Sequence, residues 1–303
     1  MSKDLLDCVS EQFRNNKVDV GMEMLFTGLR ELRLSQRPGV WQKTVHADLR
    51  AHPISEIVKL DPMTRRSFLK PRGYPGDAVL LDMVYRHSSF RLARVPKIGQ
   101  EIYEFIASCH AARAVRYRRH YIASSIDYLA QQVLQPKIMS LACGHLREAE
   151  LSGAIQNGAI GEYYAVDQDE KSLQTVRDDY GRFGVVTCKG SVQSIIKKQL
   201  KANNFDFIYS AGLYDYLNKK VARTLTLRLF ELLADDGRLL ITNFLPRIQA
   251  VGYMESFMDW HLVYRNELEM MDIITPIPRN RIERIEMFVE KQENIVFMQI
   301  QKR

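Results

Sequence analysis

The sequence predicts an α/β protein with a parallel sheet in its second half and a helical part before it. Two observations lead to this fold class. After residue 136, five short apolar runs alternate with helical patterns, and each run ends in small or polar residues. The runs cover residues 138–141, 163–166, 185–188, 205–210 and 238–242. Strands that alternate with helices form parallel sheets, in which ligands bind at the carboxyl ends of the strands.

The first run opens the stretch on which the prediction depends, residues 137–148 (KIMSLACGHLRE). The strand breaks there at Ala142, Cys143 and Gly144, and we expect a helix that carries Leu146 to follow. A tight glycine turn lets a ligand approach the backbone closely, beside the free N–H groups of a helix start. Because Gly144 stands alone, the pattern G-x-G-x-x-G is absent and a dinucleotide is not expected.

An acidic residue stands at the end of the second run. Asp167 follows Gly144 by 167 − 144 = 23 residues, at the tip of the predicted second strand. A carboxylate about 20 residues after the glycine turn is placed to accept hydrogen bonds from both ribose hydroxyls of a nucleoside. The two motifs together predict a nucleoside site at this edge of the sheet.

These motifs resemble those of the class I S-adenosylmethionine-dependent methyltransferases, over the chain from Lys137 to its C-terminus. The resemblance implies a Rossmann-like sheet of seven strands, one of them antiparallel, with S-adenosylmethionine as cofactor. In that family the glycine turn holds the methionyl end, the acid holds the ribose, and the turn after the third strand holds the adenine. The cofactor residues implied here are Cys143, Gly144, Arg147, Asp167, Gln168, Ser191, Val192, Ser210 and Ala211. The first motif is poor in glycine, and Ser191 stands where an Asp is usual.

Composition and charge exclude several classes of protein. The net charge is +7 over 303 residues, but the arginines are spread out and no RNA-binding module is recognisable, so we expect no nucleic-acid partner. No run of 18 apolar residues predicts a membrane span, and the first residues do not resemble a signal peptide. The four cysteines are scattered without metal-ligand spacing, which favours a reducing cytoplasm and no metal site. The oligomeric state stays open, a homodimer included.

The chain before the sheet is expected to be helical. Helical periodicity covers residues 5–13, 20–32, 40–50, 54–60, 78–85 and 110–133. We therefore divide the chain into a helical lid, residues 1–135, and a cofactor domain, residues 136–303. Asp61 and Asp77 are expected to cap the helices that follow them.

A stiff loop interrupts the helical part at residues 70–77 (KPRGYPGD). Two prolines and two glycines in six residues are typical of a rigid connector between helices. Such a loop either serves only as a connector or presents Tyr74 to an active site, as lid loops do.

Four segments sharpen the resemblance to one bacterial subfamily. They are PRGYPGD (71–77), AARAVRYRRHY (111–121), IYSAGLYDYL (208–217) and YMESFMDWHLVYR (253–265). The segments are similar to those of methyltransferases that make 3-hydroxy fatty acid methyl ester signals, a branch of secondary metabolism. The same scaffold resembles the azetidine-2-carboxylate synthases, which cyclise the aminobutyryl chain of S-adenosylmethionine itself.

Methyl transfer needs proximity and orientation more than a strong acid–base pair. Candidate catalytic residues are Tyr74, Tyr214, Asp215 and Asn243, and candidate substrate residues are Arg116, Tyr216 and Tyr253. Tyrosine faces can hold a sulfonium by cation–π attraction. Arg147 either binds a ligand carboxylate with two parallel hydrogen bonds or pairs with Glu148 or Glu150 at the surface. The basic run 113–120 is typical of a solvated face, although Arg113, Arg116 and His120 share one side that can point at the cofactor.

Three functions follow from these residues, in order of preference. The first is methyl transfer to a small carboxylic acid or a lipid-derived acceptor. The second is cyclisation of the cofactor, with release of methylthioadenosine. The third is a regulator that binds S-adenosylmethionine without catalysis. An RNA methyltransferase ranks below these, because a helical lid does not suit an extruded base.

Overall fold

The computed structural model describes residues 2–303 and divides into two compact units. Unit 1 comprises the chain up to Arg116 together with Arg247–His261. Unit 2 comprises Tyr117–Pro246 and Leu262–Arg303. The helix α8 (His110–Gln132) begins in unit 1 and continues into unit 2. The segment Arg247–His261 therefore belongs to the helical unit, although it lies within the sequence of the second half.

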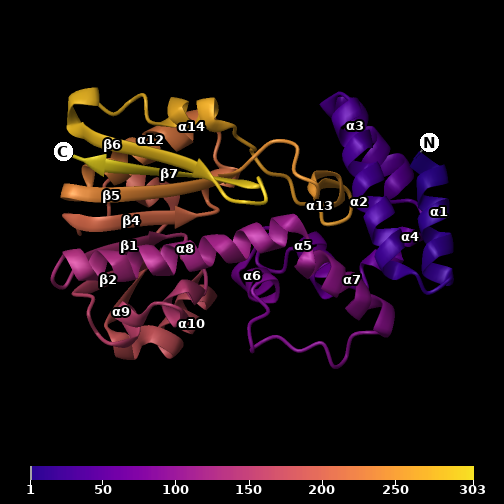
Figure 1. The fold of residues 1–303 in the computed structure, drawn as a ribbon, viewed down its shortest axis with the longest axis horizontal. Helices are drawn as coiled ribbons and strands as arrows, with labels where there is room; N and C mark the ends of the chain where they lie inside the picture. Colours follow the sequence, from indigo (N-terminus) through magenta and orange to yellow (C-terminus); the bar gives the residue numbers. More distant parts are fainter. Residues whose placement is uncertain (1) are drawn as a thin grey trace. The chain divides into compact units, whose positions relative to one another are not determined.

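Unit 2 is built on one sheet of seven strands, in the order β3-β2-β1-β4-β5-β7-β6 (Figure 1). The strands are β1 (Lys137–Leu141), β2 (Glu162–Asp167), β3 (Val185–Lys189), β4 (Phe205–Ala211), β5 (Leu233–Phe244), β6 (Ile282–Val289) and β7 (Ile295–Lys302). The pairings among β1 to β5 are parallel, and β7 runs antiparallel to β5 and β6. This topology confirms the predicted Rossmann-like sheet of the class I methyltransferase type.

Helices cover the sheet of unit 2 through complementary apolar faces. Besides α8 they are α9 (Gly153–Gln156), α10 (Glu170–Tyr180), α11 (Val192–Ile196), α12 (Lys219–Glu231) and α14 (Glu267–Ile273). Short 3-10 turns are η2 (Arg147–Glu150), η3 (Gly181–Phe183), η4 (Tyr214–Tyr216) and η5 (Arg279–Arg281). On one face, Leu239 and Ile241 of β5 and Met298 of β7 share a core with Leu229 of α12 and Met270 of α14. Burial of such side chains is the main source of sheet stability.

Unit 1 is helical. Its elements are α1 (Ser2–Arg14), α2 (Val18–Ser35), α3 (Pro38–Thr44), the π-helix η1 (Val45–Leu49), α4 (Ile54–Val58), α5 (Pro62–Leu69), α6 (Ala78–Val84), α7 (Lys97–Ser108), the start of α8, and α13 (Val251–Ser256). Glu255 of α13 accepts hydrogen bonds from Arg33 Nε and Trp41 Nε1. A Cβ on Gly252 would lie 2.4 Å from the backbone of Leu29, so only glycine allows α13 to approach α2 this closely.

Two predicted helix caps are confirmed in unit 1. The Asp61 carboxylate accepts hydrogen bonds from the N–H groups of Met63 and Thr64, and that of Asp77 accepts one from Leu80. Asp77 also forms a two-pronged ion pair with Arg66, at 2.7 and 2.8 Å. The loop 70–77 is thus fixed at its end by a buried carboxylate.

The prediction of a helix directly after the glycine turn is wrong. Leu146 has a left-handed backbone (φ 53°) and only a 3-10 turn, Arg147–Glu150, follows it. An α-helix begins later, at Gly153, where the Ser152 side chain accepts a hydrogen bond from the N–H of Ile155. The cause is local: a residue in the left-handed region ends helical propagation, and the next cap starts it again.

Candidate functional site

The turn after β1 is the centre of the site. Ala142, Gly144 and Leu146 all have positive φ angles, of 58°, 55° and 53°. Left-handed backbone is uncommon for residues other than glycine and clusters at functional sites, where the surrounding structure holds it. Cys143 is buried between them, and its N–H donates to the carbonyl of Val166. The turn therefore follows the end of β2 closely.

Asp167, at the end of β2, contacts this turn directly. Its Oδ2 accepts a hydrogen bond of 2.8 Å from Gly144 N, and its Oδ1 accepts one of 2.9 Å from Asp169 N. The side chain is buried, and burial raises its pKa above the ordinary value, against these hydrogen bonds. The next residue, Gln168, is exposed. The structure thus brings together the two residues that the sequence separated by 23 positions.

The turn after β3 joins the same edge. Gly190 N donates to the carbonyl oxygen of Asp167 at 2.9 Å. Ser191 caps α11: its hydroxyl accepts from Ser194 N, and the Ser194 hydroxyl accepts from Ser191 N. The Ser191 carbonyl also accepts hydrogen bonds, from the Ser194 hydroxyl and from Ile195 N. Because the polar groups of Ser191 are engaged in this turn, a ligand would meet the backbone surface of Ser191 and Val192.

The turn after β4 completes the edge. The Ser210 hydroxyl donates to the carbonyl of Leu141 at 3.0 Å, which ties the ends of β4 and β1 together. Ala211 follows, and Gly212 has a φ of +107°. A side chain at this position would be strained by that backbone and would also lie 3.4 Å from the guanidinium nitrogens of Arg118.

Arg118 of α8 was not among the site residues predicted from the sequence. It was included in a solvated basic face, but its side chain is only 3% exposed. Within residues 2–303, its Nε and Nη1 atoms are buried and have no hydrogen-bond partner. The charge of Arg118 acts against the raised pKa values of Asp215 and Glu148, but neither carboxyl group forms a hydrogen bond with these two nitrogens. Because buried nitrogens without a hydrogen bond are costly, they suit an anionic group of a ligand. An arginine among five basic residues on one helix carries no sequence signal that marks it as the buried one.

Arg147 lies in a separate ion-pair cluster. Its Nη1 is 2.8 Å from Asp179 Oδ2 and 3.1 Å from Glu150 Oε1. Next to it, Glu148 accepts a hydrogen bond from the Tyr209 hydroxyl at 2.5 Å, and that hydroxyl also contacts the Tyr163 hydroxyl. Burial raises the pKa of Glu148, although the Tyr209 hydrogen bond lowers it. These contacts fix the 3-10 turn after the glycine motif.

Three candidate catalytic residues form a buried network in unit 2. Arg265 Nη1 donates to the Tyr214 carbonyl and to Asn243 Oδ1, both at 2.7 Å. Asp215 Oδ1 accepts from Phe244 N at 2.7 Å. The Tyr214 hydroxyl shares a hydrogen bond with Thr226. Tyr216, by contrast, is 40% exposed.

The remaining candidates, Tyr74, Arg116 and Tyr253, lie in unit 1. Arg116 Nη1 donates to the carbonyl of Val84 at 2.8 Å. The Tyr253 ring is buried against Phe26, and its hydroxyl shares a hydrogen bond with Thr64. Tyr74 lies in the loop 70–77 and is half-buried.

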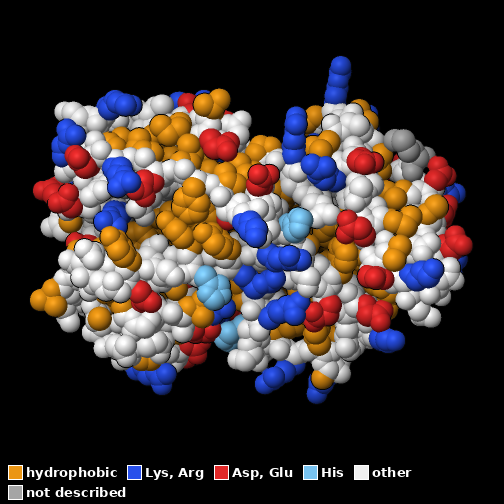
Figure 2. Space-filling view, in the orientation of Figure 1, with side chains coloured by type: hydrophobic (Ala, Val, Ile, Leu, Met, Phe, Trp, Pro, Cys, Tyr) orange, Lys and Arg blue, Asp and Glu red, His pale blue; other side chains and the backbone are white. Residues whose placement is uncertain are grey.

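No group of three or more His, Cys, Asp or Glu side chains is arranged to hold a metal ion in the described part of the chain. None of the helices described combines the length and the apolar character that a membrane crossing needs. On the face drawn in Figure 2, acidic and basic side chains are interspersed over unit 2.

Comparison with known proteins gives structural likenesses at low identity. Neither a protein-family model nor a curated protein matches the sequence. The chain is similar to a Bordetella parapertussis protein described as a possible exported protein, at 12% identity and a TM-score of 0.64, over 87% of this chain and 94% of that one.

Two further likenesses have lower TM-scores. One is to the N-methyltransferase NodS of Bradyrhizobium japonicum WM9 in complex with S-adenosyl-L-homocysteine, at 12% identity and a TM-score of 0.45, over 62% and 87% of the chains. The other is to the magnesium protoporphyrin IX methyltransferase of Synechocystis PCC 6803, at 13% identity and 0.45, over 63% and 87%. Likenesses at such identities concern the fold and leave the reaction open.

Proposed function

We propose that this protein is an S-adenosylmethionine-dependent methyltransferase that acts on a small carboxylic acid or a lipid-derived acceptor. The observation that carries the proposal is a pair of buried groups of opposite charge type in unit 2. Asp167 presents a carboxyl group beside the Gly144 turn, and Arg118 presents an unpaired guanidinium beside Gly212. S-adenosylmethionine has ribose hydroxyls and a carboxylate, which are complementary to these two groups.

The residues of this edge fit the cofactor in kind. Asp167 would accept from the ribose hydroxyls, the backbone of Ser191 and Val192 would contact the adenine, and Arg118 would hold the carboxylate. We assign the carboxylate to Arg118 because the guanidinium of Arg147 is already in ion pairs. When bound, S-adenosylmethionine supplies a methyl group on a sulfonium. The contribution of the chain is to orient that group and an acceptor in line and to exclude water.

The finer predictions rest on the sequence. Membership of the PRGYPGD subfamily and a role in secondary metabolism rest on the resemblance, and a cytoplasmic location rests on the scattered cysteines. A lid function for the helical unit is supported by the loop 70–77, whose end is held by the ion pair between Arg66 and Asp77. Tyr74, Arg116 and Tyr253 stay predicted as residues on the acceptor side.

Cyclisation of the cofactor is the second candidate, because Arg118 favours it equally. Ring closure needs the cofactor's own carboxylate to be clamped, and an unpaired buried arginine is such a clamp. Mass spectrometry of products separates the two reactions. Methylthioadenosine formed without any acceptor would indicate cyclisation, and demethylated cofactor formed only with an acceptor would indicate methyl transfer. Binding with neither product would favour a regulator.

Replacing Asp167 with alanine is expected to weaken binding of S-adenosylhomocysteine by about 1–3 kcal/mol, or roughly 5- to 150-fold, because two ribose hydroxyls lose their acceptor. Titration calorimetry measures the loss. Asp178→Ala is the matched control, since Asp178 is exposed on α10 and its carboxylate accepts a hydrogen bond from the Gln174 amide. Equal affinities of the two variants would remove Asp167 from the site, and no binding by the folded wild-type protein would end the proposal.

Replacing Arg118 with methionine is expected to reduce affinity for S-adenosylhomocysteine about 10- to 100-fold, the usual range for a charge-assisted hydrogen bond. Methylthioadenosine, which lacks the carboxylate, should bind the wild-type protein and the variant equally. The ratio of the two affinities therefore isolates the carboxylate contact from any general effect on folding. If the variant keeps the wild-type preference for S-adenosylhomocysteine, Arg118 does not hold that carboxylate.

A further inference from the structure

A concave site lies in unit 2, at the opposite end of the parallel strands from Asp167. A cavity of about 400 Å³ opens between α8 and the sheet, which is within the size range of small-molecule sites. Phe207, near the beginning of β4, pairs with Arg238, in the middle of β5, and both line the cavity together with Gln301 near the end of β7. In a parallel sheet the amino ends of the strands lie on one side and the carboxyl ends on the other. This cavity is therefore distinct from the proposed cofactor site, which lies at the carboxyl ends.

The sheet face in this cavity is polar where an apolar surface is expected. Sheet faces covered by helices are normally lined by Val, Ile and Leu. Here Gln301 lies between Arg238 and Arg284 in one cross-strand row, and Gln299 lies beside Glu286 in the next. The polar residues gather at this end of the face. In the following row, Phe297 stacks on Phe288 with ring centroids 4.8 Å apart.

The cavity is lined by one more positive side chain than negative side chains. Arg284 and Glu286 form an ion pair of 2.6 Å and neutralise each other. Arg238 has no hydrogen bond or ion pair with any residue of the described chain, and its guanidinium lies over the ring of Tyr128, 5.8 Å from the centroid. The side-chain amides of Gln299 and Gln301 are likewise without a hydrogen bond to a described residue. The cavity therefore contains one cation and two amides that have no hydrogen-bond partner among the described residues.

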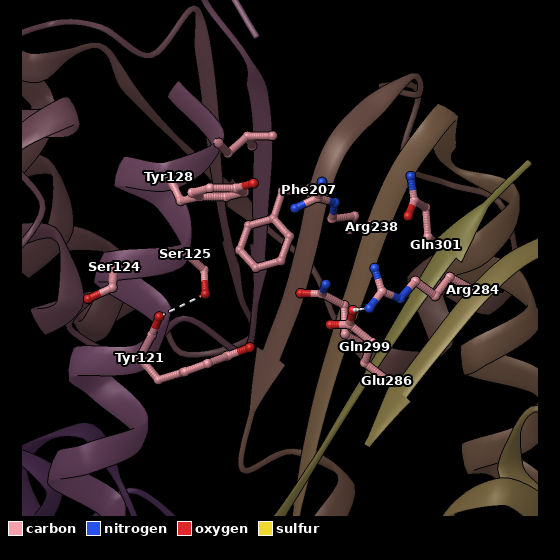
Figure 3. Close-up of a pocket in the computed structure, with 11 residues that line it drawn as sticks. Tyr121, Ser124, Ser125, Tyr128, Phe207, Arg238, Arg284, Glu286, Gln299 and Gln301 are labelled. Carbon is pink, nitrogen blue, oxygen red and sulfur yellow. Dashed lines mark hydrogen bonds and ion pairs between the residues drawn. The ribbon is translucent and has the colours of Figure 1, made fainter. Parts of the chain in front are cut away.

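Aromatic side chains line the cavity from the helix and from the sheet. Tyr121 and Tyr128 come from α8, and the buried ring of Phe207 comes from β4. Figure 3 shows Tyr128 and Phe207 close to the guanidinium of Arg238, with Gln299 and Gln301 further along the sheet. In Figure 2, hydrophobic side chains gather on the part of the surface where Figure 1 draws α8 and β7. A flat ring fits such a wall, since aromatic faces stack on one another.

We propose that this cavity binds a small aromatic monocarboxylate, with its carboxylate on Arg238 and its ring against Tyr121 and Tyr128. A guanidinium matches a carboxylate with two parallel hydrogen bonds, and the Gln299 and Gln301 amides can donate to the same oxygens. The single unpaired cation corresponds to a single negative charge on the ligand. One unpaired arginine balances only one of the two charges of a dianion such as phosphate, and it is too little for a nucleic acid.

The test uses phenylacetate and its neutral isostere phenylacetamide as probes on the full-length protein. Saturation-transfer NMR is expected to detect phenylacetate binding, with an affinity at least tenfold tighter than that of phenylacetamide. Arg238→Gln should reduce the phenylacetate affinity at least tenfold and remove the preference over the amide. Arg279→Gln is the control for the loss of one positive charge, since Arg279 is exposed and outside the cavity, and it should bind like the wild-type protein.

The proposal is independent of the cofactor site, so Asp167→Ala should leave phenylacetate binding unchanged. A phenylacetate signal that disappears in Asp167→Ala but persists in Arg238→Gln would place the ligand at the other edge and overturn the inference. Absence of any phenylacetate signal up to ~10 mM, where a ligand of this size with one ion pair should saturate, would overturn it as well. Equal affinity for phenylacetate and phenylacetamide would reject the role of Arg238.

Discussion

Replacing Arg265 with methionine is expected to lower the free energy of unfolding by about 3–5 kcal/mol, the usual cost of removing one partner from a buried charged network. Arg265 is 5% exposed, and its guanidinium is the common donor to three acceptors, two in the turn formed by η4 and one on β5. Nη1 donates to the Tyr214 carbonyl and to Asn243 Oδ1, and Nη2 donates to the Leu217 carbonyl. Methionine fills a similar volume but removes the donor to all three acceptors, of which the Tyr214 carbonyl keeps a hydrogen bond from Leu217 N.

Urea denaturation followed by circular dichroism measures the loss. Arg279→Met is the matched control, because Arg279 is exposed and is expected to change stability by less than about 0.5 kcal/mol. A loss below about 1 kcal/mol for Arg265→Met would mean that water replaces the guanidinium and that the network is not closed. The same substitution should also displace Tyr214 and Asn243, since both are held by Arg265.

The fold was predictable because its signals are local and repeated. The parallel strands were marked by apolar runs ended by small residues, and the seven-stranded sheet with one antiparallel strand was implied by the family resemblance. The caps at Asp61 and Asp77 were predictable since an acidic side chain before a helical pattern satisfies free N–H groups. The helix after Gly144 was not predictable, because the left-handed backbone of Leu146 depends on the packing of the turn and not on its residue type.

The candidate site was predictable in position and less so in its contacts. The ends of parallel strands share one edge, so Gly144 and Asp167 had to lie close together, and the structure joins them by a hydrogen bond. The burial of Arg118 on the basic helix α8 was not predictable. Which arginine of α8 is buried depends on the rotation of the helix about its axis where it packs on the sheet, and the residues near Arg118 do not indicate that rotation. The contacts of Asn243 depend on Arg265, 22 residues later, on a segment with no regular pattern.

Replacing Asp215 with asparagine is expected to stabilise the protein at alkaline pH, by on the order of 2–4 kcal/mol, since each unit of pKa shift corresponds to about 1.4 kcal/mol. Burial raises the pKa of Asp215 from 3.8 to about 7, although the hydrogen bond from Phe244 N and the charges of Arg118 and Arg265 lower it. The folded state therefore favours the protonated carboxyl. Asparagine is neutral at every pH and keeps an oxygen in place to accept from Phe244 N.

The raised pKa of Asp215 makes stability fall as the pH rises. Between pH 4 and pH 7 the folded state binds more protons than the unfolded state, so each step up in pH costs stability until Asp215 is ionised in both. The advantage of the variant should thus be largest at pH 8 and shrink by more than half at pH 5. Burial also raises the pKa of Asp61, to about 6, so Asp61 likewise lowers stability as the pH rises. This contribution is the same in both proteins and cancels in the difference between them.

Thermal unfolding at the two pH values measures the effect. A variant that is less stable than the wild-type protein at pH 8 would instead show that Asp215 is held ionised as the counter-charge of Arg118 and Arg265, and Arg118 would then need no anion from a ligand.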